Sequence, residues 1–238
     1  MKIEDLKVDI YADGADIDGM LEMSNKSYIK GFTTNPSLMK KAGVKDYAKF
    51  AKEVTSHITD LPISFEVFAD DFPTMKKEAL ILSKFGKNVF VKIPVTNTKG
   101  ESSANLVKEL SAEGVNLNIT AIFTLEQTEK IVDALSGNTK NIISVFAGRI
   151  ADTGVDPEPL MKKAAKICHE KQGTKLLWAS CREVFNVVQA DRSDTDIITV
   201  TNDILGKLKM FEKDLTEYSL DTVKQFYEDG KSLGFHIA

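Results

Sequence analysis

A single lysine stands in the middle of an apolar run. Residues 88–95 read NVFVKIPV, a β-branched stretch typical of a buried strand, and Lys92 is its only charged residue. Burying an ammonium group without a partner costs several kcal/mol, unless the group is paired or gives up its proton. Lys92 therefore needs either a buried partner or a chemical role.

The two-residue period of β-strands predicts what surrounds this amine. If the runs 62–69, 88–95 and 115–122 and the first run of the chain are strands, each has an apolar face and a polar face. The polar faces carry Lys92, Glu66, Asn118, Thr120 and Asp13. An amine, carboxylates, a hydroxyl and an amide at similar depth are what proton-transfer chemistry needs. The simpler alternative is a buried Lys92–Glu66 ion pair with only a structural role.

Eight such β-rich runs position these side chains, and a helix-like segment follows each of them. The runs are 7–13, 29–35, 62–69, 88–95, 115–122, 141–148, 175–181 and 196–202. Eight β-α units without a linker predict one domain over 1–238, an α/β fold of the closed (β/α)8 TIM-barrel type, whose polar strand faces point inward. An open doubly wound sheet is the alternative, but no G-x-G-x-x-G follows the first run. In TTNPSLMKKAG, Asn35 and Pro36 predict a helix start and Gly43 its end.

Composition narrows the class of protein. The chain has 238 residues, 42% hydrophobic and 28% charged, with a net charge of −4. Without a basic stripe, a signal peptide or a long apolar run, we expect no nucleic-acid partner, no membrane partner and a cytoplasmic location. Two cysteines, Cys168 and Cys181, suit a reducing compartment. The three histidines are far apart in sequence, so no His-rich metal site is expected.

Several motifs together resemble the transaldolase family. They are GFTTNPSL (31–38), VFVKIPVT (89–96), NLNITAIFTLEQ (116–127), SVFAGRI (144–150) and WASCREV (178–184). The resemblance covers nearly the whole chain and is closest to the compact branch, which also contains the fructose-6-phosphate aldolase-like enzymes. It implies a cofactor-free mechanism in which Lys92 forms a Schiff base with a ketone, because an amine that burial keeps unprotonated is nucleophilic near neutral pH.

The resemblance also implies roles for other residues. Asp13 would transfer the proton of the substrate C4 hydroxyl, and Glu66 with Thr120 would position a water during imine formation and hydrolysis. Substrate contacts are implied for Asn35, Asn118, Ser144 and Phe146, and phosphate contacts for Arg149, Ser180 and Arg182.

Several of these residues and their neighbours could instead have purely structural roles. Arg149 and Arg182 could form surface salt bridges. Thr33 and Thr34 are expected to shape the turn before Pro36. By strand parity Trp178 faces the interior as packing, whereas Cys181 faces outward.

Two positions distinguish transfer from simple cleavage within the family. The aldolase-like enzymes usually have glutamine at the position of Glu66 and a proton-donating tyrosine at the position of Phe146. The match therefore favours a transaldolase of the pentose phosphate pathway. It would convert sedoheptulose 7-phosphate and glyceraldehyde 3-phosphate to erythrose 4-phosphate and fructose 6-phosphate. The alternatives are a class I aldolase on the same scaffold and a non-catalytic barrel that binds a sugar phosphate.

The C-terminal segment, from about residue 219, reads LDTVKQFYEDGKSLGF over 220–235. Leu220, Val223, Phe226 and Tyr227 fall at helical spacing. Compact relatives are often decamers, so the segment is expected to be either the arm of a homo-oligomer, up to a decamer, or a helix packed on its own barrel.

Overall fold

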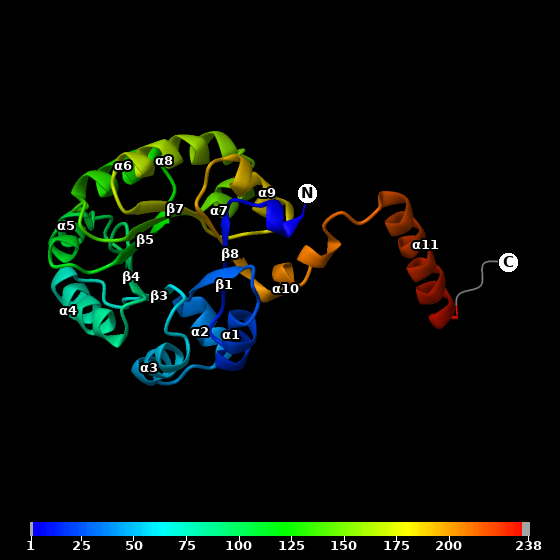
Figure 1. Cartoon of the computed structure of the whole chain (residues 1–238), viewed down its shortest axis with the longest axis horizontal. Helices are drawn as coiled ribbons and strands as arrows, with labels where there is room; N and C mark the ends of the chain where they lie inside the picture. Colours follow the sequence, from blue (N-terminus) through cyan, green and yellow to red (C-terminus); the bar gives the residue numbers. More distant parts are fainter. Residues whose placement is uncertain (1, 235–238) are drawn as a thin grey trace.

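The computed structural model describes residues 2–234 and has eight parallel strands that close into a barrel (Figure 1). Neighbouring strands pair in sequence order, from β1 to β8, and β8 pairs with β1. The (β/α)8 fold expected from the alternation of runs is therefore confirmed, and the open doubly wound sheet is not what forms. Residues 1 and 235–238 of the predicted domain lie outside the described part.

Each strand lies almost wholly within one of the predicted runs. The strands are β1 Asp9–Asp13, β2 Ile29–Thr33, β3 Ile63–Glu66, β4 Val89–Pro94, β5 Leu117–Ile122, β6 Asn141–Val145, β7 Thr174–Trp178 and β8 Ile197–Thr201. Most runs extended too far at their carboxyl ends. The residues beyond the strands there enter the turns that bear most of the site.

The helices, all but the last, cover the outside of the barrel (Figure 1). They are α1 Ile17–Ser24, α2 Pro36–Ala42, α3 Tyr47–His57, α4 Phe72–Leu82, α5 Ala104–Ala112, α6 Leu125–Ala134, α7 Ala147–Asp152, α8 Glu158–Glu170, α9 Phe185–Arg192, α10 Asn202–Leu205 and α11 Leu215–Ser232, with short 3-10 turns at Ile3–Asp5, Ser83–Phe85 and Leu208–Met210. The predicted ends of α2 are confirmed. Asn35 caps it by accepting from the Leu38 N–H at 2.9 Å, and Gly43 ends it with φ of 71°.

Two separate apolar layers hold the barrel together. The larger lies between sheet and helices, where Val91 and Ile119 are completely buried. The smaller fills the barrel interior, with the side chains of Tyr11, Phe90, Ile142, Leu177, Ala179 and Ile197. Gly31 leaves room for the Tyr11 ring of this inner layer, because a Cβ there would lie 2.5 Å from the ring and force it to shift. Below the polar residues, the interior is thus a packed core rather than a pore.

The helix α11 extends away from the barrel (Figure 1). It begins at Leu215, about four residues before the predicted boundary, and none of its residues is buried. It therefore does not form the helix packed on its own barrel that was one of the two expectations. Within residues 2–234, no helix has the length and apolarity needed to cross a membrane.

Candidate active site

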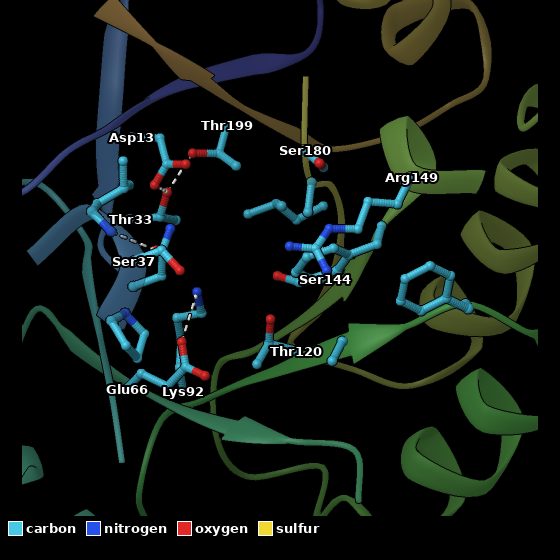
Figure 2. Close-up of a pocket in the computed structure, with 18 residues that line it drawn as sticks. Asp13, Thr33, Ser37, Glu66, Lys92, Thr120, Ser144, Arg149, Ser180 and Thr199 are labelled. Atoms are coloured by element: carbon cyan, nitrogen blue, oxygen red, sulfur yellow. Dashed lines mark hydrogen bonds and ion pairs between the residues drawn. The ribbon is translucent and has the colours of Figure 1, made fainter. Parts of the chain in front are cut away.

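A cavity of about 440 Å³ opens at the carboxyl ends of the strands (Figure 2). Its lining comes from strands and turns all around the barrel: Asp13, Thr33, Asn35, Pro36, Ser37, Leu38, Glu66, Lys92, Thr120, Ala121, Phe123, Ser144, Phe146, Arg149, Leu177, Ala179, Ser180 and Thr199. This end of a (β/α)8 barrel is where the active sites of such barrels lie. Most of the polar residues singled out from the sequence meet here.

Lys92 lies on the wall of this cavity and is 7% exposed. The sheet register places Lys92 on β4 directly beside Glu66 on β3, and Nζ lies 3.4 Å from Glu66 Oε2. Nζ also donates a hydrogen bond to the backbone carbonyl of Thr34 at 3.0 Å. The amine is thus held by two oxygens and still borders open space, which a purely structural ion pair would not require.

Asp13 lies at the end of β1, on the same side of the cavity as Lys92 (Figure 2). It accepts a hydrogen bond from the Thr33 hydroxyl at 2.9 Å. Burial raises the pKa of Asp13 above its usual range, while the charge of Lys92 and the Thr33 hydrogen bond oppose this shift and the charge of Glu66 adds to it. A carboxyl with a raised pKa can exchange protons closer to neutrality.

Two hydroxyls approach the lysine from β5 and β6. Thr120 and Ser144 both line the cavity, as strand parity predicts. The Ser144 hydroxyl donates to Asn118 Oδ1 at 2.6 Å, and Asn118 Nδ2 donates to Ser64 Oγ at 3.0 Å. Asn118 is completely buried and does not line the cavity. It orients Ser144, whose oxygen lone pairs remain available toward the cavity.

Asn35 combines two tasks at the turn after β2. Its side-chain oxygen is used to cap α2, so its two amide hydrogens remain as donors at the cavity wall. Ser37, in the first turn of α2, also points toward the cavity (Figure 2). These donors suit the hydroxyl groups of a sugar.

Arg149 reaches into the cavity from α7 on the side opposite Asp13 (Figure 2). Its guanidinium lies over the Phe146 ring, 5.1 Å from the centroid, and Phe146 stacks on Phe123 with centroids 5.6 Å apart. In the described part of the chain no carboxylate forms a salt bridge with Arg149. Its donors are therefore free to bind an anion in the cavity.

Two non-glycine residues at the cavity rim have left-handed backbones, Ala121 with φ of 60° and Ser180 with φ of 66°. Both interrupt the alternation of side chains along the strand. Ala121 therefore lines the cavity, although the two-residue period of residues 115–122 predicts that it faces outward with Leu117 and Ile119. Ser180 lines the cavity next to Ala179 for the same reason. The prediction that Trp178 faces the interior is wrong, because it is completely buried in the outer layer while Leu177 faces inward.

Glycine is required beside Ser180. A Cβ on Gly148 would lie 1.6 Å from the Ser180 carbonyl oxygen, and the Gly148 N–H donates to the carbonyl of Ala179 at 3.2 Å. This close approach of α7 to the end of β7 brings Arg149 and Ser180 to the same part of the cavity.

Arg182 is outside the cavity lining. Its guanidinium forms a bidentate pair with Asp152, with Nε 3.2 Å from Oδ1 and Nη2 bonded to Oδ2, and about half of its side chain is exposed. Of the three residues with implied phosphate contacts, the structure brings Arg149 and Ser180 together and leaves Arg182 at the surface.

The cavity lining also contains residues that were not expected in the site, among them the hydroxyl-bearing Thr33, Ser37 and Thr199 and the aromatic Phe123. Thr33 was assigned to the turn, yet its parity with Gly31 along β2 would have placed it inside. Thr199 has inward parity with Ile197 on β8, a strand from which no site residue was predicted. Across residues 2–234, no group of three or more His, Cys, Asp or Glu side chains is arranged to hold a metal ion.

Fold and cavity together define a (β/α)8 barrel with a buried lysine at the carboxyl end of its strands, flanked by two carboxylates. The family model described as transaldolase/fructose-6-phosphate aldolase matches residues 10–237, and the chain belongs to that family. A protein named probable transaldolase from Thermoanaerobacter sp. (strain X514) is 35% identical over 95% of this chain and 99% of its own length. Proteins with the same name from Bartonella henselae (32%; 96% of this chain, 99% of the relative) and Methanococcus maripaludis strain C6 (35%; 89% and 93%) are also similar.

Proposed function

We propose that the protein is a cytoplasmic transaldolase of the pentose phosphate pathway. It transfers a dihydroxyacetone unit from sedoheptulose 7-phosphate to glyceraldehyde 3-phosphate and yields erythrose 4-phosphate and fructose 6-phosphate. The observation that carries the proposal is the buried Lys92 amine at the cavity wall, 3.4 Å from Glu66 and on the same side as Asp13. The family and the names of the relatives support the same reaction type.

The reaction begins with attack of the Lys92 nitrogen on the C2 ketone of the donor sugar. Loss of water from the resulting carbinolamine needs a proton on the leaving oxygen, and Glu66 with Thr120 hold the water that transfers it. Asn35, Ser37 and Ser144 offer polar groups to the sugar hydroxyls.

Cleavage follows when the Asp13 carboxylate takes the proton of the C4 hydroxyl. The C3–C4 bond breaks, its electron pair moves toward the imine to give an enamine, and the aldose phosphate leaves. In the second half, the enamine carbon attacks the acceptor aldehyde and Asp13 returns its proton to the new C4 oxygen. Hydrolysis of the imine then releases fructose 6-phosphate and the free amine of Lys92.

Phe146 decides between transfer and release in this proposal. Its ring lines the cavity and carries no proton, so the enamine is not protonated from this side before an acceptor arrives. We expect Phe146→Tyr to raise the release of free dihydroxyacetone and lower transfer, because it adds a proton donor with little change in volume. Release is measured as the rate of dihydroxyacetone formation from fructose 6-phosphate without an acceptor. Transfer is measured as the rate of fructose 6-phosphate formation from sedoheptulose 7-phosphate and glyceraldehyde 3-phosphate.

Phe123→Tyr adds the same hydroxyl to the other ring of the stack, which also lines the cavity, and it tests whether the effect depends on the position of the hydroxyl. If the unmutated protein already cleaves fructose 6-phosphate as fast as it transfers, the transaldolase proposal fails and the aldolase alternative replaces it.

Arg149 binds the substrate phosphate, with Ser180 beside it. Arg182 has a secondary role, because its guanidinium is paired with Asp152 and lies outside the cavity lining. We expect Arg149→Gln to raise KM for fructose 6-phosphate about ten- to a hundredfold, since losing a charge-assisted partner of a phosphate costs about 1.5–3 kcal/mol. KM for unphosphorylated fructose is expected to stay nearly unchanged. Arg182→Gln, measured in parallel, is expected to have a smaller effect. Equal losses for both sugars would assign Arg149 a structural role.

The proposal includes a homo-oligomer that assembles through α11. Its exposed apolar side chains include Val223, Phe226 and Tyr227, at least 60% exposed, and such a face is suited to a second copy of the chain. We expect Phe226→Glu to shift sedimentation toward the monomer, whereas Gln225→Glu, which adds the same charge to a neighbouring position, leaves the oligomer intact. A monomeric unmutated protein would contradict this assignment.

A further inference from the structure

The hydroxyl of Thr199 is a polar group at the cavity that the proposed mechanism does not use. Thr199 lies on β8, is 6% exposed, and contacts the Thr33 hydroxyl from the strand on the other side of β1 (Figure 2). Strand β1 pairs with both β2 and β8: Asp13 is level with Thr33 on β2, whereas Thr199 on β8 is level with Tyr11, two residues before Asp13.

The direction of the hydrogen bonds follows from the number of protons. A hydroxyl has one proton to donate, and Thr33 gives its proton to Asp13 Oδ1 at 2.9 Å. In the contact between the threonines, Thr199 must therefore be the donor and Thr33 Oγ1 the acceptor. The result is a chain from Thr199 through Thr33 to the carboxylate, and hydrogen bonds in such a chain strengthen one another.

The charged surroundings of Asp13 are few. The charges of Lys92 on β4 and Glu66 on β3 act on its pKa with opposite signs. Asp16 lines a small neighbouring cavity with Asp13, and it caps α1 by accepting from the Gly19 N–H at 2.8 Å. No cation on β2 or β8 contacts Asp13 in the described part of the chain. The threonine pair is therefore what stabilises and orients this carboxylate from its own side of the barrel.

We propose that Thr199 is a positioning residue of the reaction, which acts on Asp13 through Thr33. The chain holds Asp13 Oδ1, so that Oδ2 is left to take the proton of the substrate C4 hydroxyl. It also favours the carboxylate, the form that must be present at the moment of cleavage. The reaction role rests on the proposed function, whereas the hydrogen-bond chain itself does not.

The test compares Thr199→Val, which keeps the shape and removes the donor, with Thr199→Ser, which keeps the donor. The carboxyl of Asp13 is followed by NMR in protein labelled with 13C at aspartate carboxyls, and Asp13→Asn identifies its signal. We expect the Asp13 carboxyl to titrate at higher pH in Thr199→Val and close to the unmutated position in Thr199→Ser. The acidic limb of the kcat profile is expected to move in the same direction, with a two- to tenfold loss of kcat at about unchanged KM.

A double variant tests whether the effect passes through Thr33. If it does, adding Thr199→Val to Thr33→Val changes the titration of Asp13 no further. An unchanged Asp13 titration in Thr199→Val, or full additivity with Thr33→Val, would overturn the inference. Thr199→Ala gives the same measurement if the valine variant fails to fold. Failure of the proposed reaction itself would show as the absence of transfer by the unmutated protein, which leaves the NMR titration a valid test of the chain.

Discussion

Lys92→Arg is expected to lower transaldolase activity by at least about 10⁴-fold, because a guanidinium stays protonated and cannot attack a ketone. The variant keeps a cation beside Glu66, so the ion pair of the cavity wall is preserved and the fold is expected to persist. Steady-state transfer from sedoheptulose 7-phosphate to glyceraldehyde 3-phosphate measures the loss, and circular dichroism checks the fold.

A surface lysine provides the matched control. Lys175→Arg makes the same exchange at a half-exposed residue that pairs with Asp9 at 3.1 Å, at the opposite end of β1 from Asp13. It is expected to retain full activity. A folded Lys92→Arg protein with near-normal transfer would exclude a covalent role for this amine.

Asp13→Asn is expected to lower kcat about 10²- to 10⁴-fold while leaving imine formation intact. The amide preserves the shape and can still accept from Thr33, but it cannot take the C4 proton. Rapid-quench measurement of the covalent intermediate against product release separates the two steps. If formation of the covalent intermediate and release of product were lost equally, Asp13 would act in imine formation instead.

The pH dependence of the unmutated protein has a definite sign. Burial raises the pKa of Asp13, and the carboxylate is the base that cleavage needs. Activity is therefore expected to fall as pH drops through this raised pKa, at a higher pH than for an ordinary aspartate. In Asp13→Asn this acidic limb should be missing from the residual activity.

Many of the residues that line the cavity could be predicted from the two-residue period of the strands alone. Once β3, β4 and β5 are recognised, alternation places Glu66, Lys92 and Thr120 inside, and the barrel register brings the first two side by side. This succeeds because the side-chain period of a regular strand is set by the backbone and not by the partner elements.

The carboxyl ends of the strands were harder to predict. Left-handed residues at Ala121 and Ser180 change which side chains face inward, and nothing in an alanine or a serine signals such a backbone. The error at Trp178 has this origin. Backbone strain of this kind is often found where a structure holds a functional site.

The two-residue period of the strands also could not predict which side chains pair with each other. Whether an arginine at a strand end turns inward depends on which carboxylates lie near it, and Asp152 on α7 holds Arg182 at the surface. Similarly, Asn118 has inward parity but is completely buried, and its side-chain oxygen accepts a hydrogen bond from Ser144, which does line the cavity. Such choices are made by contacts between elements distant in sequence.

Borohydride trapping tests the central claim most directly. The protein is incubated with fructose 6-phosphate, reduced with sodium borohydride, digested and mapped by mass spectrometry. The account predicts a reduced dihydroxyacetone adduct on Lys92 and on no other lysine. An adduct on a different lysine with Lys92 unmodified, or no adduct from protein that is active in transfer, would contradict it.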